Sequence, residues 1–177
     1  MSNLSQTPSV LYTDRLLLRS PEAADAKAIQ TLIHNPKIAE MTATIPYPYP
    51  LSAAKEWIKH VSLMRAEGLI AAYLICHREC REIMGVISLK RLSNMDINIA
   101  YWLGEAYWGN GVCTEAGKKI LAMAEGLKIS PVIARHLKGN EGSRGVLLKL
   151  GFKELGEEIM NHRGSDASFI CYRYEDP

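Results

Sequence analysis

The stretch that decides the fold of this chain is Tyr101-Trp102-Leu103-Gly104-Glu105-Ala106-Tyr107-Trp108-Gly109-Asn110-Gly111-Val112-Cys113-Thr114-Glu115-Ala116. Its pattern predicts the end of a strand, then a glycine turn, then the start of a helix. The first turn of a helix exposes backbone N–H donors and the positive end of the helix dipole. Glycines just before it let a ligand approach that backbone closely. The stretch therefore predicts an anion site of the kind that binds a phosphorylated cofactor.

Length and composition predict a single domain spanning residues 1–177, with residues 1–9 as a flexible tail. The chain has 177 residues, of which 47% are hydrophobic, and its formal net charge is +2. Such a small positive charge does not indicate binding to nucleic acid or to a membrane surface. No apolar run approaches the length of a membrane span, and the polar first ten residues do not resemble a signal peptide.

Four cysteines bear on location and on metal binding: Cys76, Cys80, Cys113 and Cys171. They are too sparse for a disulfide framework, which favours a reducing, cytoplasmic location. Cys76, His77 and Cys80 lie close together, but no second ligand pair follows at the spacing of a structural zinc site. No metal is therefore expected.

Hydrophobic periodicity and turn residues predict a mixed α/β domain with seven strands and four helices. The strands are expected at residues 10–19, 69–76, 83–89, 96–103, 131–137, 152–157 and 167–174. Four helices are expected, beginning at Ser20, at Ser52, after Gly111 and at Asn140. Pro36 is expected to close the region of the first helix. Between the first two, residues 46–50 alternate proline and tyrosine, which predicts a stiff loop. That loop could line a substrate pocket or only cover the core.

Three kinds of phosphate-binding loop could account for the glycine turn. A dinucleotide-binding loop needs a further glycine where Thr114 stands, and a P-loop needs Gly-Lys-Ser/Thr at the helix start. Neither is present. The stretch from Trp108 to Cys113 instead resembles the Gln/Arg-x-x-Gly-x-Gly/Ala loop of the GCN5-related N-acetyltransferase superfamily, with Gly111 matching and Trp108 and Cys113 departing from it. Taken alone, this short match is also compatible with a purely structural turn.

An ordered series of further motifs strengthens the resemblance. The series is Thr13-Asp14-Arg15-Leu16-Leu17-Leu18-Arg19, Tyr101-Trp102-Leu103, Thr114-Glu115-Ala116, Asn140-x-x-Ser143 and Lys149-Leu150-Gly151-Phe152. It is similar to the Rim-type branch, which acetylates the N-termini of ribosomal proteins, and it covers roughly residues 11–174. The resemblance implies an acyl-CoA N-acyltransferase fold, in which two central strands splay apart around acetyl-coenzyme A.

The resemblance also implies the residues that bind the cosubstrate. Backbone groups near Trp102 and Leu103 are expected to pair with the pantetheine arm. Asn140 matches a family asparagine near the thioester, although it also suits a helix N-cap, and Arg144 could meet a phosphate or simply face water. The pyrophosphate is expected on the backbone N–H groups of Trp108, Gly109, Asn110, Gly111, Val112, Cys113 and Thr114.

The implied reaction is direct attack of an amine on the thioester, which needs a proton acceptor and a donor to the leaving thiolate. The tyrosine that many members use as the donor is replaced by Leu147, so Ser143 is the candidate acid. The glutamate that relatives carry on the strand is replaced by Asn98, which can orient a water or the amine but cannot act as a base. Asp96 shares its face but suits a solvated turn. Cys113 is not expected to be a nucleophile.

The acceptor is left open by the sequence. The Rim-type resemblance favours the α-amine of a protein N-terminus, including a ribosomal one. Relatives in this branch also acetylate polyamines, amino acids or antibiotics, so a small amine is the alternative. Because Asn98 and Leu147 depart from the common pattern, a non-catalytic sensor of acetyl-coenzyme A is a further alternative. A nucleotide-binding regulator is less favoured. Either a monomer or a homodimer is compatible with the sequence.

Overall fold

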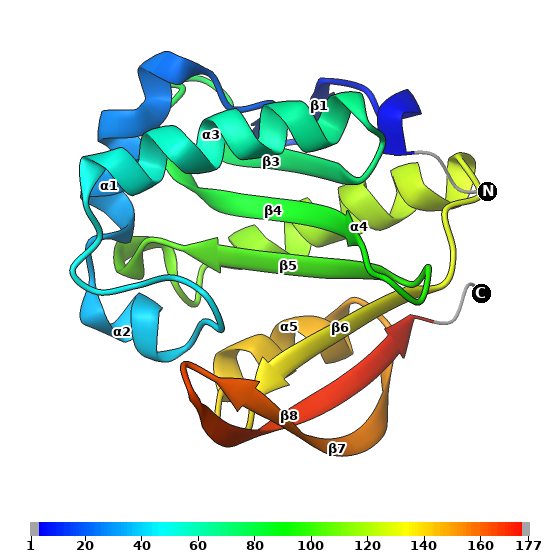
Figure 1. The fold of residues 1–177 in the computed structure, drawn as a ribbon. Coiled ribbons are helices and arrows are strands. Elements are labelled where there is room, and N and C mark those ends of the chain that lie inside the picture. Colours follow the sequence, from blue (N-terminus) through cyan, green and yellow to red (C-terminus); the bar gives the residue numbers. More distant parts are fainter. Residues whose placement is uncertain (1–3, 175–177) are drawn as a thin grey trace.

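The computed structural model describes residues 4–174, which form one eight-stranded sheet in the order β1-β2-β3-β4-β5-β6-β8-β7 (Figure 1). The strands are β1 (Val10–Tyr12), β2 (Leu16–Arg19), β3 (Ile70–His77), β4 (Ile83–Arg91), β5 (Ile97–Leu103), β6 (Val132–Leu137), β7 (Phe152–His162) and β8 (Ser165–Tyr174). The α-helices are α1 (Ala26–Ile33), α2 (Pro36–Glu40), α3 (Leu51–Ala66), α4 (Val112–Gly126) and α5 (Glu141–Lys149). Short 3-10 turns cover Leu4–Gln6, Ala23–Asp25 and Glu105–Tyr107.

The predicted mixed α/β domain is confirmed, but the first expected strand is two strands. β1 and β2 form an antiparallel hairpin in which Val10 pairs with Arg19. The chain reverses at the polar residues Thr13, Asp14 and Arg15, where Thr13 N donates to Leu16 O at 3.0 Å. A continuous strand pattern therefore concealed a turn, which raises the strand count from seven to eight.

The helix boundaries also differ from those expected. Pro36 begins α2 instead of closing a helix, because Asn35 caps it by accepting a hydrogen bond from Lys37 N at 2.9 Å. α3 begins at Leu51 with Pro50 at its N-cap, so Ser52 lies inside the helix. The helix expected at Ser20 is preceded by the 3-10 turn Ala23–Asp25.

Residues 4–9 of the expected tail make contacts with the domain. Leu4 is fully buried in the core, and Thr7 Oγ1 donates to Leu4 O at 2.7 Å. Arg65 on α3 binds the carbonyl oxygen of Thr7 at 2.7 Å. This segment therefore packs against the domain, and residues 1–3 of the expected tail lie outside the described residues.

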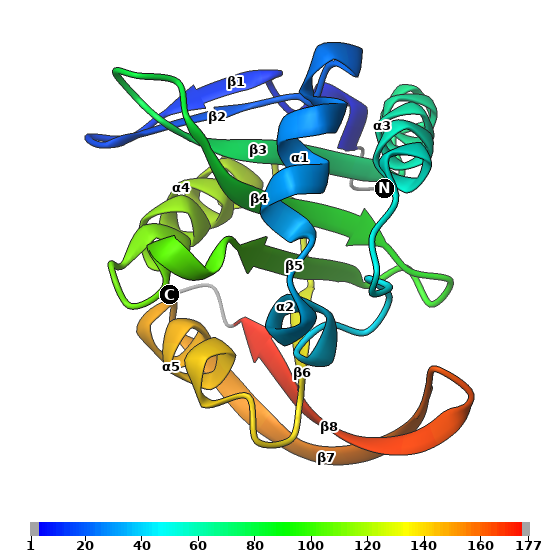
Figure 2. The same cartoon turned by 90° about the vertical axis from the view of Figure 1, so that its left-hand side faces the viewer.

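Two hydrophobic cores lie on opposite faces of the sheet, as Figure 2 shows, with α1 and α3 on one side and α4 and α5 on the other. The core beneath α4 includes Ile97, Ile99 and Leu103 of β5, whereas the core beneath α1 and α3 includes Leu74 and Val86. β3 is buried over nearly its whole length because helices cover both faces of the sheet there.

The two central parallel strands separate after only two paired positions. β5 pairs with β4 along its full length, from Arg91↔Ile97 to Gly85↔Leu103. It pairs with β6 only at Ile97↔Val132 and Asn98↔Ile133, after which the strands diverge (Figure 1). Beyond Asn98, the β6-facing edge of β5 therefore carries backbone groups without a ladder partner, and such groups can bind the amides of an extended ligand.

Candidate functional site

The glycine loop follows the end of β5 and leads into α4. Gly109 and Gly111 have φ values of 76° and 73°, in the left-handed region that favours glycine, and Gly111 is the N-cap of α4. Trp108 folds back, and its Nε1 donates to Leu103 O at 2.9 Å. The first helical bond runs from Glu115 N to Gly111 O at 2.9 Å. Among residues 4–174, the three preceding N–H groups of the helix have no acceptor and can bind an anion.

The predicted loop residues differ in their exposure. As whole residues, Trp108, Gly109, Asn110 and Gly111 are exposed, Thr114 is half-buried, and Val112 and Cys113 are buried. Burial raises the pKa of the Cys113 thiol to about 12, so the thiol is protonated at neutral pH. A protonated, buried thiol is a poor nucleophile, which agrees with the expectation that Cys113 contributes only its backbone N–H.

An open hollow lies beside the loop and contains two lysines that sequence reasoning did not identify. Lys118 lies one turn after Thr114 on α4, and Lys149 ends α5, so the two come from separate helices. No short motif connects them. The hollow is lined by Asp14, Gly111, Thr114, Glu115, Lys118 and Lys149. Arg144 does not line it; its guanidinium instead lies 3.8 Å from the carboxylate of Glu141 on the same helix.

The N-terminus of α5 brings Asn140 and Ser143 together and joins them to β5. Asn140 is the N-cap that was expected, because its Oδ1 accepts from Ser143 N at 3.0 Å. The hydroxyls of Ser143 and Tyr101 lie 3.0 Å apart, and the Tyr101 hydroxyl also donates to Ser143 O at 3.2 Å. Burial raises the pKa of Tyr101, so its hydroxyl stays protonated. The alternation of apolar residues along β5 could have indicated that Tyr101 faces α5, but not what it binds.

The two predicted catalytic side chains, Asn98 and Ser143, lie on opposite faces of β5. Side chains alternate along a strand, so Asn98 and Trp102 face away from Tyr101, the residue that contacts Ser143. Asp96 precedes the strand, and its carboxylate accepts from Asn94 Nδ2 at 2.7 Å, as expected of a turn residue. Asn98 therefore belongs to the α1 and α3 side of the sheet, and Ser143 to the α4 and α5 side.

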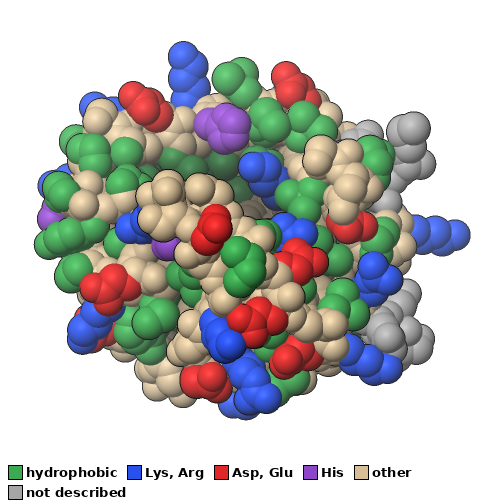
Figure 3. All heavy atoms as spheres, turned by 60° about the horizontal axis from the view of Figure 1, so that its bottom comes forward, with side chains coloured by type: hydrophobic (Ala, Val, Ile, Leu, Met, Phe, Trp, Pro, Cys, Tyr) green, Lys and Arg blue, Asp and Glu red, His purple; other side chains and the backbone are tan. Residues whose placement is uncertain are grey.

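The segment after α2 is held across the molecule by hydrogen bonds to its backbone. The Arg163 guanidinium, in the β7–β8 turn, donates to the carbonyl oxygens of Ala39, Thr42 and Ile45. Asn140 Nδ2 donates to Met41 O at 3.3 Å. These bonds place residues 39–45 next to the N-terminus of α5 and the end of the β7–β8 hairpin. Figure 3 shows that this side of the molecule is hollowed, with hydrophobic side chains inside and basic and histidine side chains at the rim.

The two tyrosines of the proline–tyrosine loop differ in burial, and only the expectation that the loop covers the core is confirmed. Tyr49 is buried in the core beneath α1 and α3. Tyr47 is 50% exposed, and its ring lies 5.2 Å from that of His34. His136, the histidine nearest α5 in sequence, is buried between Tyr172 and its own strand, with Nε2 3.0 Å from the Tyr172 hydroxyl. It is a structural histidine of the core.

Residues 4–174 contain neither a metal-binding cluster nor a helix able to cross a membrane. No group of three or more His, Cys, Asp or Glu side chains in that range is placed to hold a metal ion. None of the helices described there combines the length and the apolar character that crossing a membrane requires.

Comparisons with known proteins agree with this geometry. The chain is 27% identical over 149 residues to the uncharacterized N-acetyltransferase p20 of Bacillus licheniformis, covering 82% of this chain and 83% of the relative. It is 27% identical over 173 residues to the uncharacterized N-acetyltransferase YoaA of Bacillus subtilis, covering 95% and 97%. The fold matches the microcin C7 self-immunity acetyltransferase MccE, solved with acetyl-CoA and AMP, at a TM-score of 0.83 and 22% identity over 97% of this chain and 98% of that one.

A second solved structure with this fold is RimL, the ribosomal L7/L12 alpha-N-protein acetyltransferase in complex with coenzyme A. Its TM-score is 0.82 at 18% identity, covering 93% of this chain and 96% of that one. The model of the acetyltransferase (GNAT) domain matches residues 15–153, well over half of the chain. This protein therefore belongs to the acetyltransferase (GNAT) domain family.

Proposed function

We propose that this protein transfers the acetyl group of acetyl-coenzyme A to a primary amine. The observation that carries the proposal is the separation of β5 from β6 beside a glycine loop that opens α4, in a chain of the GNAT family. The β6-facing edge of β5 after Asn98 suits the amide groups of a pantetheine arm, while Trp102 is paired with Val86 of β4 and Leu103 O accepts from Trp108 Nε1. The N–H groups at the start of α4 suit a pyrophosphate.

The proposed chemistry uses the two faces of β5 in different ways. A neutral amine attacks the thioester carbon, and a backbone N–H of β5 stabilises the oxyanion of the tetrahedral intermediate. When the C–S bond breaks, the thiolate takes a proton from Ser143 Oγ, whose hydroxyl is oriented by Tyr101. Asn98, on the opposite face, orients the amine or a water that accepts the proton lost by the attacking nitrogen.

The acceptor we propose is the α-amine of a protein N-terminus. The Rim-type motifs and the likeness to RimL, whose described substrate is ribosomal L7/L12, support this class. The likeness to MccE, a self-immunity acetyltransferase solved with AMP, supports a small-molecule amine as the alternative. A non-catalytic sensor would bind acetyl-coenzyme A and transfer nothing.

Calorimetric titration with acetyl-coenzyme A tests the cosubstrate. A thiol-release assay over N-terminal peptides, polyamines, amino acids and aminoglycosides tests the acceptor. Release of coenzyme A with peptides alone would support the proposed class, and release with small amines alone would overturn it. Tight binding without release for any acceptor would favour the sensor, whereas no binding would refute the proposed function.

A further inference from the structure

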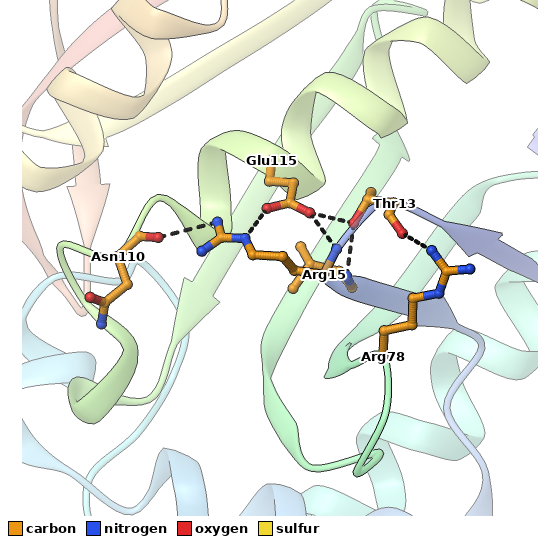
Figure 4. Close-up of polar contacts among 6 residues, drawn as sticks. Thr13, Arg15, Arg78, Asn110 and Glu115 are labelled. Carbon is orange, nitrogen blue, oxygen red and sulfur yellow. Dashed lines mark hydrogen bonds and ion pairs between the residues drawn. The ribbon is translucent and has the colours of Figure 1, made fainter.

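The turn between β1 and β2 is attached to the first turn of α4 by one carboxylate, that of Glu115 (Figure 4). Glu115 Oε1 accepts from Thr13 Oγ1 at 2.6 Å and from Arg15 N at 3.1 Å, and Oε2 accepts from Arg15 Nε at 2.6 Å. Burial alone would raise the pKa of Glu115, but these hydrogen bonds outweigh it and lower the pKa below its usual value. Glu115 is therefore ionised and holds Arg15 in place through both carboxylate oxygens.

A second arginine holds the same turn from the opposite side without reaching the glycine loop. Arg78 Nη1 donates to Thr13 O at 2.8 Å, and Arg78 N donates to Arg15 O at 2.8 Å. Figure 4 shows the Arg15 side chain extending from the turn toward Glu115 and Asn110, whereas Arg78 reaches the turn at Thr13 from a separate segment. The backbone of Arg15 is thus fixed on two sides, and only its own guanidinium extends to the loop.

The Arg15 guanidinium contacts the loop at the peptide that joins Asn110 to Gly111. Arg15 Nη2 donates to Asn110 O at 3.3 Å and lies 3.7 Å from the position that a Cβ on Gly111 would occupy. The Asn110–Gly111 peptide is followed by a glycine, whose φ of 73° is in the left-handed region, and glycine accepts either sign of φ at low cost, so rotating this peptide plane costs less than it would before any other residue.

The direction of the Asn110 carbonyl determines the direction of the Gly111 N–H, which could donate a hydrogen bond to a phosphate. In a trans peptide the C=O and the following N–H point in opposite directions. While Asn110 O is bound to Arg15, the Gly111 N–H points away from Arg15, and among residues 4–174 it has no acceptor. A rotated peptide would instead turn the negative end of the carbonyl dipole toward the ligand and repel phosphate.

We propose that Arg15, held by Glu115, is a positioning residue that keeps the Asn110–Gly111 peptide turned so that the Gly111 N–H meets the pyrophosphate of the cosubstrate. This inference rests on the proposed function. The Thr-x-Arg turn and the Thr-Glu-Ala element then act together, because Glu115 holds Arg15 and Arg15 fixes the orientation of the Asn110–Gly111 peptide before the cosubstrate binds.

The test compares three variants and two thioesters. S-acetylpantetheine carries the same thioester arm as acetyl-coenzyme A but no phosphate. R15Q should raise the Kd for acetyl-coenzyme A about tenfold, equivalent to ~1.4 kcal/mol, and leave binding of S-acetylpantetheine within about twofold. R78Q is the matched control, because it removes an arginine side chain that binds the same turn from the β3–β4 connection but makes no bond to the loop; it should leave both Kd values unchanged.

The variant R15K distinguishes a positioning role of Arg15 from a general effect of its positive charge. Lysine keeps the positive charge but lacks the planar fork that bridges a carboxylate and a carbonyl, so R15K should weaken acetyl-coenzyme A binding as R15Q does. E115Q should produce a smaller loss with the same selectivity, because its amide can still accept from Thr13 but its nitrogen cannot accept from Arg15 Nε. Thermal melting confirms that each variant is folded.

Three results would overturn the inference while leaving the proposed function intact. They are wild-type affinity in R15Q, wild-type affinity in R15K, and an equal loss for both thioesters in R15Q. Absence of acetyl-coenzyme A binding by the wild-type protein would refute the proposed function itself, and this inference with it. A loss of affinity for acetyl-coenzyme A but not for S-acetylpantetheine in R15Q, R15K and E115Q, with both affinities unchanged in R78Q, would support the positioning role of Arg15.

Discussion

Replacing Ser143 with alanine should slow acetyl transfer while leaving the fold intact, because the hydroxyl makes few structural contacts. The N-cap bond of α5 uses the backbone N of Ser143, so the substitution keeps it. The Tyr101 hydroxyl loses Ser143 Oγ as a partner but keeps Ser143 O at 3.2 Å. No buried hydroxyl is therefore left without a partner, and the free energy of unfolding should fall by no more than ~1 kcal/mol.

The loss in turnover should be much larger than this change in stability. Removing a positioned general acid typically costs between about 10²-fold and 10⁴-fold in rate. Because coenzyme A thiolate is a moderately good leaving group, we expect the lower end, a fall in kcat of about 10²-fold. The Kd for acetyl-coenzyme A should stay within about twofold of the wild-type value, since Ser143 is proposed to act only as the C–S bond breaks.

The assay is thiol release at saturating acetyl-coenzyme A with the best acceptor of the panel, alongside denaturant unfolding of the same samples. S143T is the matched control, because it keeps a hydroxyl on the same carbon and should retain much more activity than S143A. A kcat for S143A within threefold of wild type would refute Ser143 as the acid. Loss of activity in parallel with a loss of several kcal/mol in stability would show a structural role instead.

Three further outcomes follow from the structure. Cys113→Ala should retain acetyl transfer, because the thiol is buried and its pKa is raised to about 12; loss of turnover in a folded variant would contradict this. Asp25→Asn should lower stability at pH 7 by about 2 kcal/mol, because Asp25 accepts from both Nη atoms of Arg19 at 2.8 and 2.7 Å. Burial raises the pKa of Asp25, but the hydrogen bonds from Arg19 and from Glu22 N, together with the charge of Arg19, lower it below its usual value. This stability is therefore present above the unfolded-state pKa near 4 and is lost as pH falls through the folded value. Unfolding midpoints between pH 2 and 7 should show a flatter acid limb in the variant. Gly85→Ala should destabilise the protein by about 3 kcal/mol in denaturant titrations, because a Cβ there would lie 2.2 Å from the backbone oxygen of Trp102; wild-type stability would contradict the close approach of β4 and β5.

Several local features of the site were predictable from sequence because they depend on a few neighbouring residues. Gly111 was expected at the start of a helix, and it is the left-handed N-cap of α4. Asn140 was expected as a cap, and its side chain accepts from Ser143 N. The hairpin of β1 and β2 was missed because its turn is polar without glycine or proline. The start of α2 was missed because Pro36 was interpreted as a stop although Asn35 makes it a start.

The sequence by itself determined the order of strands and helices, apart from the β1–β2 turn and the separate helix α2, together with the glycine loop and the family, since propensity, capping and left-handed glycines act over a few residues. Only the tertiary structure decided which side chains meet. Tyr101 reaches Ser143 across 42 residues of chain, and Arg15 reaches Glu115 across 100. Contacts of this kind arise from sheet pairing and from packing on the sheet, which no local pattern encodes. The separation of β5 from β6 after two paired residues is likewise a property of the whole sheet.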